Sequence, residues 1–167
     1  MEGEKAETMS AREDDRDGDL PDREIVSTRT FDAPRERVFG AFSDPSRLAR
    51  WWGPNGFTST VHEFDMRPGG TWRFTLHGPD GADYPSESVF VDIVKPERIV
   101  FRHLSSDHPY EMVISLEAQG DGTRVTWRMR HATASECARV KPFVVEANEQ
   151  NFDRLAAELA ASPPGGA

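Results

Sequence analysis

The sequence predicts an α+β domain in which a curved antiparallel sheet of about seven strands surrounds a long C-terminal helix. Short segments that alternate apolar and polar residues are separated by Asp-Gly and Gly-Gly pairs, which is typical of strands joined by hairpins. Residues 135–161 instead carry apolar side chains at helical spacing. Two short helices are expected between the first strand and the second.

The elements follow in a simple order. After a strand at 24–31, Asp32 with Pro34 and Asp44 with Pro45 start two short helices, because proline fits the first turn and aspartate can satisfy its free amides. The second helix ends at residues 53–56 (Gly-Pro-Asn-Gly). Six strands are then predicted at 57–66, 71–77, 84–94, 98–104, 110–118 and 123–131. Hairpin-linked strands in series indicate an antiparallel meander.

Alternation also predicts which face of the sheet is buried and what covers it. The expected inner residues are Trp72, Phe74, Leu76, Ile99, Phe101, His103, Met112, Ile114, Leu116, Val125, Trp127, Met129 and His131. The C-terminal helix offers a matching apolar stripe of Val140, Val144, Phe152, Leu155 and Leu159, with Phe143 and Ala147 beside it. Its acidic residues Glu146, Glu149, Asp153 and Glu158 are expected on the outer side.

Charge and composition bound the possible functions. Most of the net charge of −9 lies in residues 1–24, so we expect 1–23 and 162–167 to be disordered tails around a domain at 24–161. The acidic balance argues against nucleic-acid binding. Apolar stretches are too short to span a bilayer, so no membrane association is expected. The single cysteine, Cys137, excludes an internal disulfide, and cytoplasm is the expected location.

Several motifs carry a resemblance to a known family. They are Phe31-Asp32-Ala33-Pro34-Arg35-Glu36-Arg37-Val38-Phe39, Phe42-Ser43-Asp44-Pro45, Leu48-Ala49-Arg50-Trp51-Trp52-Gly53-Pro54, Asp65-Met66-Arg67-Pro68-Gly69-Gly70, Pro96-Glu97-Arg98-Ile99-Val100-Phe101 and Asp153-Arg154-Leu155. With these motifs in this order, the chain resembles the START-like superfamily, also called birch-pollen-allergen-like or SRPBCC, whose members have a helix-grip fold. The motifs point to the branch named for the activator of the 90-kDa heat-shock protein ATPase. The resemblance implies a hydrophobic cavity and, as a partner, a heat-shock ATPase chaperone.

One departure from the family pattern concerns the last helix. Members often have a Gly-Trp pair near its middle, where this sequence has Ala147 and Asn148. Loss of an indole and gain of an amide predict a roomier and more polar cavity.

The cavity between the sheet and the C-terminal helix is the candidate ligand site. Its predicted lining is Trp51, Trp52, Phe64, Trp72, Phe74, Phe101, His103, Met112, Ile114, Trp127, Met129, His131, Phe143, Ala147, Asn148 and Asn151. Trp51 and Trp52 are either a packed anchor or a gate. Because neighbouring helical residues point about 100° apart, we expect one to be buried and the other to border the cavity entrance.

Polar candidates leave alternatives open. The five histidines show no metal-ligand spacing, so neither a metal nor a cofactor is predicted. His103 and His131 either mark the pocket or sit at exposed strand ends. Glu63 and Glu87 are either an acid–base pair or surface carboxylates; Glu87 shares its parity with Val89, Val91 and Ile93.

These observations favour binding of a small hydrophobic or amphipathic molecule, with no catalysis evident. The alternatives are a chaperone-ATPase-activator-like interaction module and a polyketide cyclase/dehydratase-like enzyme, the latter by analogy with the superfamily. Either a monomer or a homodimer is compatible with the sequence.

Overall fold

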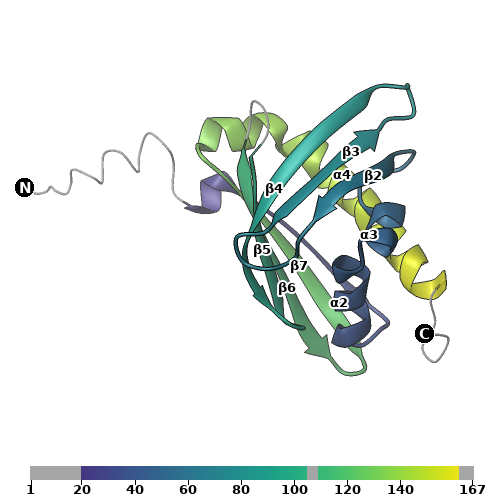
Figure 1. Cartoon of the computed structure of the whole chain (residues 1–167). Coiled ribbons are helices and arrows are strands. Elements are labelled where there is room, and N and C mark those ends of the chain that lie inside the picture. The colour runs from purple at the N-terminus through teal and green to yellow at the C-terminus, as the bar shows by residue number, and fades with distance from the viewer. Residues whose placement is uncertain (1–19, 105–108, 162–167) are drawn as a thin grey trace, which may run out of the picture.

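The computed structural model describes residues 20–104 and 109–161, which form one antiparallel sheet and its covering helices (Figure 1). The elements are η1 (Leu20–Arg23), β1 (Glu24–Phe31), α2 (Arg35–Ser43), α3 (Pro45–Trp51), β2 (Thr58–Phe64), β3 (Thr71–His77), β4 (Asp83–Val94), β5 (Arg98–His103), β6 (Tyr110–Gln119), β7 (Gly122–His131) and α4 (Ala134–Ala161). The predicted tails at 1–19 and 162–167 lie outside the described residues. Residues 20–23, assigned to the first tail, form the short helix η1 instead.

The seven strands form one sheet in the order β1-β7-β6-β5-β4-β3-β2, and every neighbouring pair is antiparallel. The meander predicted from the hairpin signals is therefore confirmed. The first strand joins it beside the last, with Ile25 opposite Met129. Seven strands, two short helices after β1 and one long final helix make the predicted α+β helix-grip architecture.

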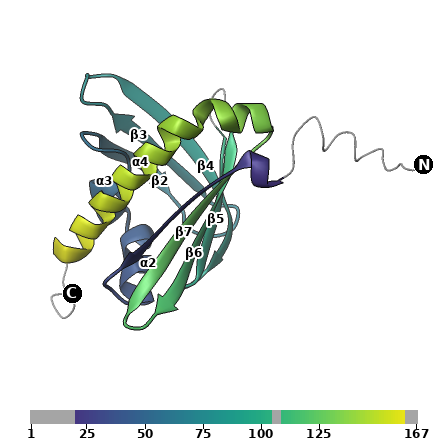
Figure 2. The ribbon, with the colours of Figure 1, turned by 180° about the vertical axis from the view of Figure 1, so that it is seen from behind.

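The long helix α4 crosses one face of the sheet, as Figure 2 shows from the side on which α4 lies in front. This inner face carries the large apolar side chains. Within α4, Phe152 and Leu155 are fully buried, while the outer side of the helix is exposed. No helix in the described part of the chain is long and apolar enough to cross a membrane.

The two short helices start differently, although both follow an Asp and a Pro. Asp44 caps α3 as predicted, because its side chain accepts a hydrogen bond from the backbone of Ser46 and Pro45 occupies the first turn. In α2, however, Pro34 is itself the N-cap and no side chain caps the helix. The prediction that Asp32 caps this helix is therefore wrong.

The two adjacent tryptophans are both buried, against the expectation that one borders an entrance. Trp51 is 1% exposed and Trp52 is 8% exposed. The helix α3 ends at Trp51, and Trp52 has an extended backbone with φ −70° and ψ 126°. Because Trp52 is no longer helical, the 100° separation does not apply, and its ring turns into the sheet.

Candidate functional site

The centre of the inner face is an aromatic cluster built around Trp52. Its ring lies 5.0 Å from the Trp72 ring, 5.3 Å from Trp127 and 6.1 Å from Phe101, measured between centroids. Trp51 packs on the other side, 5.5 Å away. Three strands and the end of α3 therefore enclose one indole. We call Trp72, Phe101 and Trp127 the aromatic box.

The space around Trp52 is almost completely filled. A void against Trp52 measures about 10 Å³, and its lining is Phe42, Leu48, Trp52, Met66, Trp72, Phe90, Ile99, Phe101 and Ile114. A single water needs about 10–15 Å³, and small-molecule pockets span about 300–1,000 Å³. The void at Trp52 is therefore too small for such a molecule in this conformation, and the prediction of a roomier cavity than in relatives stays a prediction.

The amide of Asn148 anchors α4 to β1. Asn148 is buried and donates from Nδ2 to the hydroxyl of Ser27 on β1 at 3.1 Å. The same nitrogen lies 3.6 Å from the sulfur of Met129. Ala147 beside it is only partly buried.

Three buried polar atoms near the box have no hydrogen-bond partner among the described residues. They are the indole nitrogens of Trp72 and Trp127 and the hydroxyl of Ser88. These residues are 3%, 1% and 1% exposed. Ser88 lies directly opposite Trp72 in the β3–β4 ladder. By contrast, the Trp51 indole donates to the carbonyl of Ala41 at 3.0 Å.

A row of polar side chains crosses the inner face beyond the box. Ser88 lies opposite His103, His103 opposite Tyr110, and Tyr110 opposite His131. The ring of Tyr110 stacks on His103 at 4.8 Å and lies 5.8 Å from His131, which is 2% exposed. Burial raises the pKa of Tyr110 to about 12, so its hydroxyl stays protonated at neutral pH. His131 is thus buried at this end of the strands, and sequence reasoning missed Ser88 and Tyr110.

Most of the other predicted lining residues lie on the inner face, with one clear exception. The buried ones are Phe74, Met112, Ile114 and Met129, and Phe64 is partly buried against Trp72 and Phe90. Phe143 is 74% exposed, so it does not line the interior. Its neighbours Val140 and Val144 take the inner stripe of α4, and Phe143 lies about 100° away from Val144.

The loop that carries Trp52 is held by side chains of α4. Asn151 donates to the carbonyl of Trp51 at 2.7 Å and accepts from the amide of Gly53 at 3.2 Å. Arg154 donates to the carbonyls of Gly53 and Pro54, each at 2.9 Å, and to that of Arg50. Burial lowers the pKa of Arg154. Asn151 therefore fixes the backbone on both sides of Trp52.

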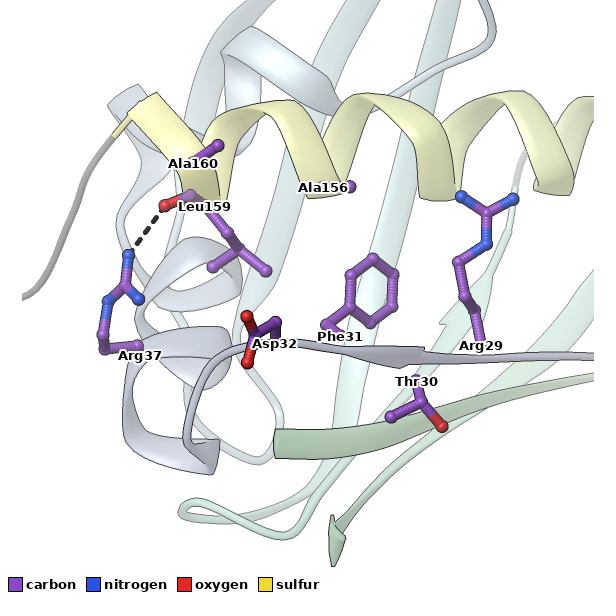
Figure 3. Close-up of a pocket in the computed structure, with 8 residues that line it drawn as sticks. All are labelled: Arg29, Thr30, Phe31, Asp32, Arg37, Ala156, Leu159 and Ala160. Atoms are coloured by element: carbon purple, nitrogen blue, oxygen red, sulfur yellow. Dashed lines mark hydrogen bonds between the residues drawn. The ribbon is translucent and has the colours of Figure 1, made fainter. Parts of the chain in front are cut away.

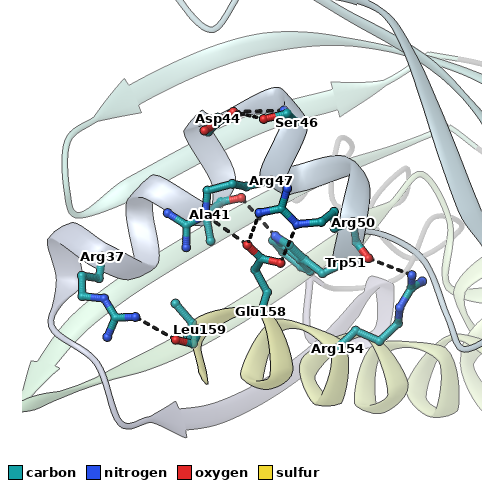
Figure 4. A network of polar contacts seen from close by, with 10 residues as sticks. All are labelled: Arg37, Ala41, Asp44, Ser46, Arg47, Arg50, Trp51, Arg154, Glu158 and Leu159. Carbon is teal, nitrogen blue, oxygen red and sulfur yellow. Dashed lines mark hydrogen bonds and ion pairs between the residues drawn. The ribbon is translucent and has the colours of Figure 1, made fainter. Parts of the chain in front are cut away.

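A second attachment joins α3 to the end of α4 (Figure 4). The carboxylate of Glu158 accepts from Arg50 at 2.7 and 3.0 Å and from Arg47 at 3.2 Å. Glu158 is 7% exposed, so its predicted place on the outer side of α4 is wrong. Hydrogen bonds from Arg50 and Arg47 hold its pKa below the usual value, although burial opposes this shift.

The two glutamates considered for acid–base chemistry face away from the interior. Glu63 is exposed and lies 3.8 Å from Arg73 on the outer face. Glu87 is exposed as well, because Ser86, Ser88 and Phe90 are the residues of β4 that turn inward. The surface alternative therefore holds for both. Within residues 20–104 and 109–161, no group of three or more His, Cys, Asp or Glu residues could hold a metal ion.

A groove of the described surface lies between β1 and the last turns of α4 (Figure 3). It has a volume of about 370 Å³. Its two cations already have partners: Arg29 binds the carboxylates of Glu149 and Asp153, and Arg37 donates to the Leu159 carbonyl. We therefore assign this groove a structural role.

Comparison with known proteins agrees with this architecture. A protein from Mycobacterium smegmatis has a similar structure, with 27% identity and a TM-score of 0.77 over 87% of this chain and 96% of that one. A Nitrosomonas europaea protein gives 18% identity and a TM-score of 0.78, with 86% and 97% covered. An AHSA1 protein from Silicibacter pomeroyi has 21% sequence identity and a TM-score of 0.70, over 84% of this chain and 99% of that one. A search of curated proteins finds no match.

The family assignment comes from the sequence match. The family described as Activator of Hsp90 ATPase homolog 1-like protein matches residues 32–160, which is most of the chain and all elements from α2 to nearly the end of α4. The fold is that of a ligand-binding type of domain. The chain therefore belongs to the family of Activator of Hsp90 ATPase homolog 1-like proteins, within the START-like superfamily.

Proposed function

We propose that this domain binds a small apolar or amphipathic molecule in the space that Trp52 occupies between the sheet and α4. The observation that carries the proposal is the aromatic box around a side chain that belongs to neither a strand nor a helix. Trp72, Phe101 and Trp127 are fixed in strands, whereas Trp52 follows the end of α3. Trp52 is thus the member of this set that lies outside regular secondary structure.

Opening the site requires rotation of one side chain and leaves the hydrogen bonds around it intact. Asn151 and Arg154 hold the backbone at Trp51, Gly53 and Pro54, so the Trp52 ring can turn outward while the loop stays in place. A tryptophan buries about 150–250 Å², so exposing it costs about 4–6 kcal/mol at 25 cal/mol per Å². A ligand must offset this cost, and we expect affinities in the micromolar range or weaker.

Intrinsic fluorescence tests the proposal directly, because all four tryptophans of the chain belong to this cluster. Fatty acids and aromatic polyketides are the two classes tested, and we expect a ligand from at least one class to shift the emission to longer wavelength as Trp52 becomes exposed, with saturation. Native mass spectrometry and displacement of an apolar dye should report the same ligands. Phe143→Ala, outside the site, should bind as the wild type does. Absence of saturable binding of every class by both the wild type and Trp52→Ala would refute the proposal.

A second candidate is an interaction with a heat-shock ATPase chaperone, which the family name suggests. Phe143 and Val145 on α4 favour it, since they are 74% and 39% exposed and large apolar side chains in contact with water often mark protein contacts. Pull-down and ATPase assays with the chaperone of the same organism test this candidate. We expect binding that Phe143→Glu weakens, and equal binding of both forms, or none, would argue against it.

The cyclase-like alternative would need titratable side chains that converge in the interior, and Glu87, one candidate for this role, faces outward. The cytoplasmic location and the choice between monomer and homodimer stay predictions.

A further inference from the structure

The exchange between Trp52 and a ligand restricts what the ligand can be. A purely apolar molecule that replaces the Trp52 ring makes the same kind of contacts with Trp72, Phe101 and Trp127 that the ring already makes. Such a molecule gains little over the resident indole, because both bury similar apolar area. Selective binding therefore needs an interaction that is not made while Trp52 fills the aromatic box.

The unmade interactions are hydrogen bonds from buried donors. The indole nitrogens of Trp72 and Trp127 can only donate, and neither has an acceptor among the described residues. Both rings lie against Trp52, at 5.0 and 5.3 Å. The unpartnered hydroxyl of Ser88 sits on the neighbouring strand opposite Trp72. Buried polar groups are normally paired, so this set of donors is unusual for a core.

The uncharged lining of the central void disfavours an anionic group there. None of the described residues that line the central void carries a charge. A buried carboxylate would lack a cationic partner there, which makes its desolvation very costly. A neutral carbonyl oxygen accepts hydrogen bonds without that cost.

We propose, on the basis of the function proposed above, that the ligand is a flat neutral aromatic molecule of about the size of indole that carries a carbonyl oxygen. Its ring takes the place of Trp52 inside the aromatic box. Its oxygen accepts a hydrogen bond from the indole N–H group of Trp72, which lies opposite Ser88, or from that of Trp127. This assigns to the interior a class of ligand distinct from free fatty acids.

The experiment compares coumarin, which has a carbonyl, with naphthalene, which has none. Trp52→Ala opens the space, and Trp52→Leu serves instead if the alanine variant fails to fold, as judged by circular dichroism. Affinity for each probe is measured by ligand-observed NMR titration in this background, and again after adding Trp72→Phe or Trp127→Phe. Each probe is compared only with itself, so its intrinsic hydrophobicity cancels. Phe143→Ala in the same background is the control.

We expect at least one of Trp72→Phe and Trp127→Phe to weaken coumarin binding at least fivefold, and both to leave naphthalene binding within twofold. The control should change neither. Equal losses for both probes, or no loss for coumarin, would overturn the assignment of a carbonyl ligand, while binding itself would still support the proposed function. If neither probe binds to any variant or to the wild type, and no other class does, the proposed function fails as well.

Discussion

Replacing Asn151 by alanine should destabilise the domain strongly, because this side chain serves two buried backbone groups at once. It donates to the Trp51 carbonyl at 2.7 Å and accepts from the Gly53 amide at 3.2 Å. Leaving a buried polar group unpaired costs about 1–3 kcal/mol, so two such groups suggest a loss of about 3 kcal/mol in the free energy of unfolding. For a domain of this size that corresponds to a fall in Tm of about 6–12 °C.

Urea unfolding followed by tryptophan fluorescence measures this loss, with an unchanged m value as the sign that the unfolded state is unaffected. Gln150→Ala is a matched control one residue away. Its side chain accepts from the exposed amide of Asn55 at 3.0 Å, so its removal should change stability by less than about 0.5 kcal/mol. A loss below about 0.5 kcal/mol for Asn151→Ala would refute the idea that this residue fixes the Trp52 loop.

Three further predictions concern single side chains. The pKa of Glu158 is lowered in the folded state, so its ion pairs stabilise the fold fully above the usual pKa of 4.5 and this stabilisation is lost as pH falls through the lower folded-state pKa. Glu158→Gln should flatten this part of the stability–pH curve. An unchanged curve would count against the pairing. Asp44→Ala should lower the free energy of unfolding by about 1 kcal/mol through loss of the α3 cap, measured by urea unfolding against Asp44→Asn, which keeps a capping side chain. Phe152→Ala removes a fully buried ring and should cost about 3–5 kcal/mol in the same assay; a loss under 1 kcal/mol would mean that α4 packs differently.

The strands and the final helix could be predicted closely because their signals are local. The first strand and β3 match the predicted bounds, and β4 to β7 differ by one residue at an end. The alternation of residue types predicted the wrong face where a β-bulge shifts the register of a strand. Glu87 shares sequence parity with Ile93, but the register shift between Phe90 and Asp92 moves them to opposite faces. A bulge of this kind leaves no mark in the alternation of residue types.

The candidate site was harder to predict because its decisive features depend on distant residues. The burial of Glu158 depends on Arg47 and Arg50, more than 100 positions earlier, so its charge alone suggested an exposed place. The filled interior depends on where α3 ends: one more helical residue would have turned the Trp52 ring elsewhere. The residue types indicated an aromatic interior, but only the path of the backbone after α3 shows that the Trp52 ring occupies it.

The position of β1 has a consequence for the synthesis of the chain. Among the described strands it pairs with β7 alone, so Ile25 cannot pair until Met129 has been synthesised. The helix α4 must follow before that face is covered. Contacts between segments so far apart slow folding, and they leave β1 open to association with other chains in the meantime. A nascent or truncated chain that ends before residue 122 lacks this closing strand. Ribosome-bound fragments should therefore become resistant to protease only after β7 and α4 have emerged.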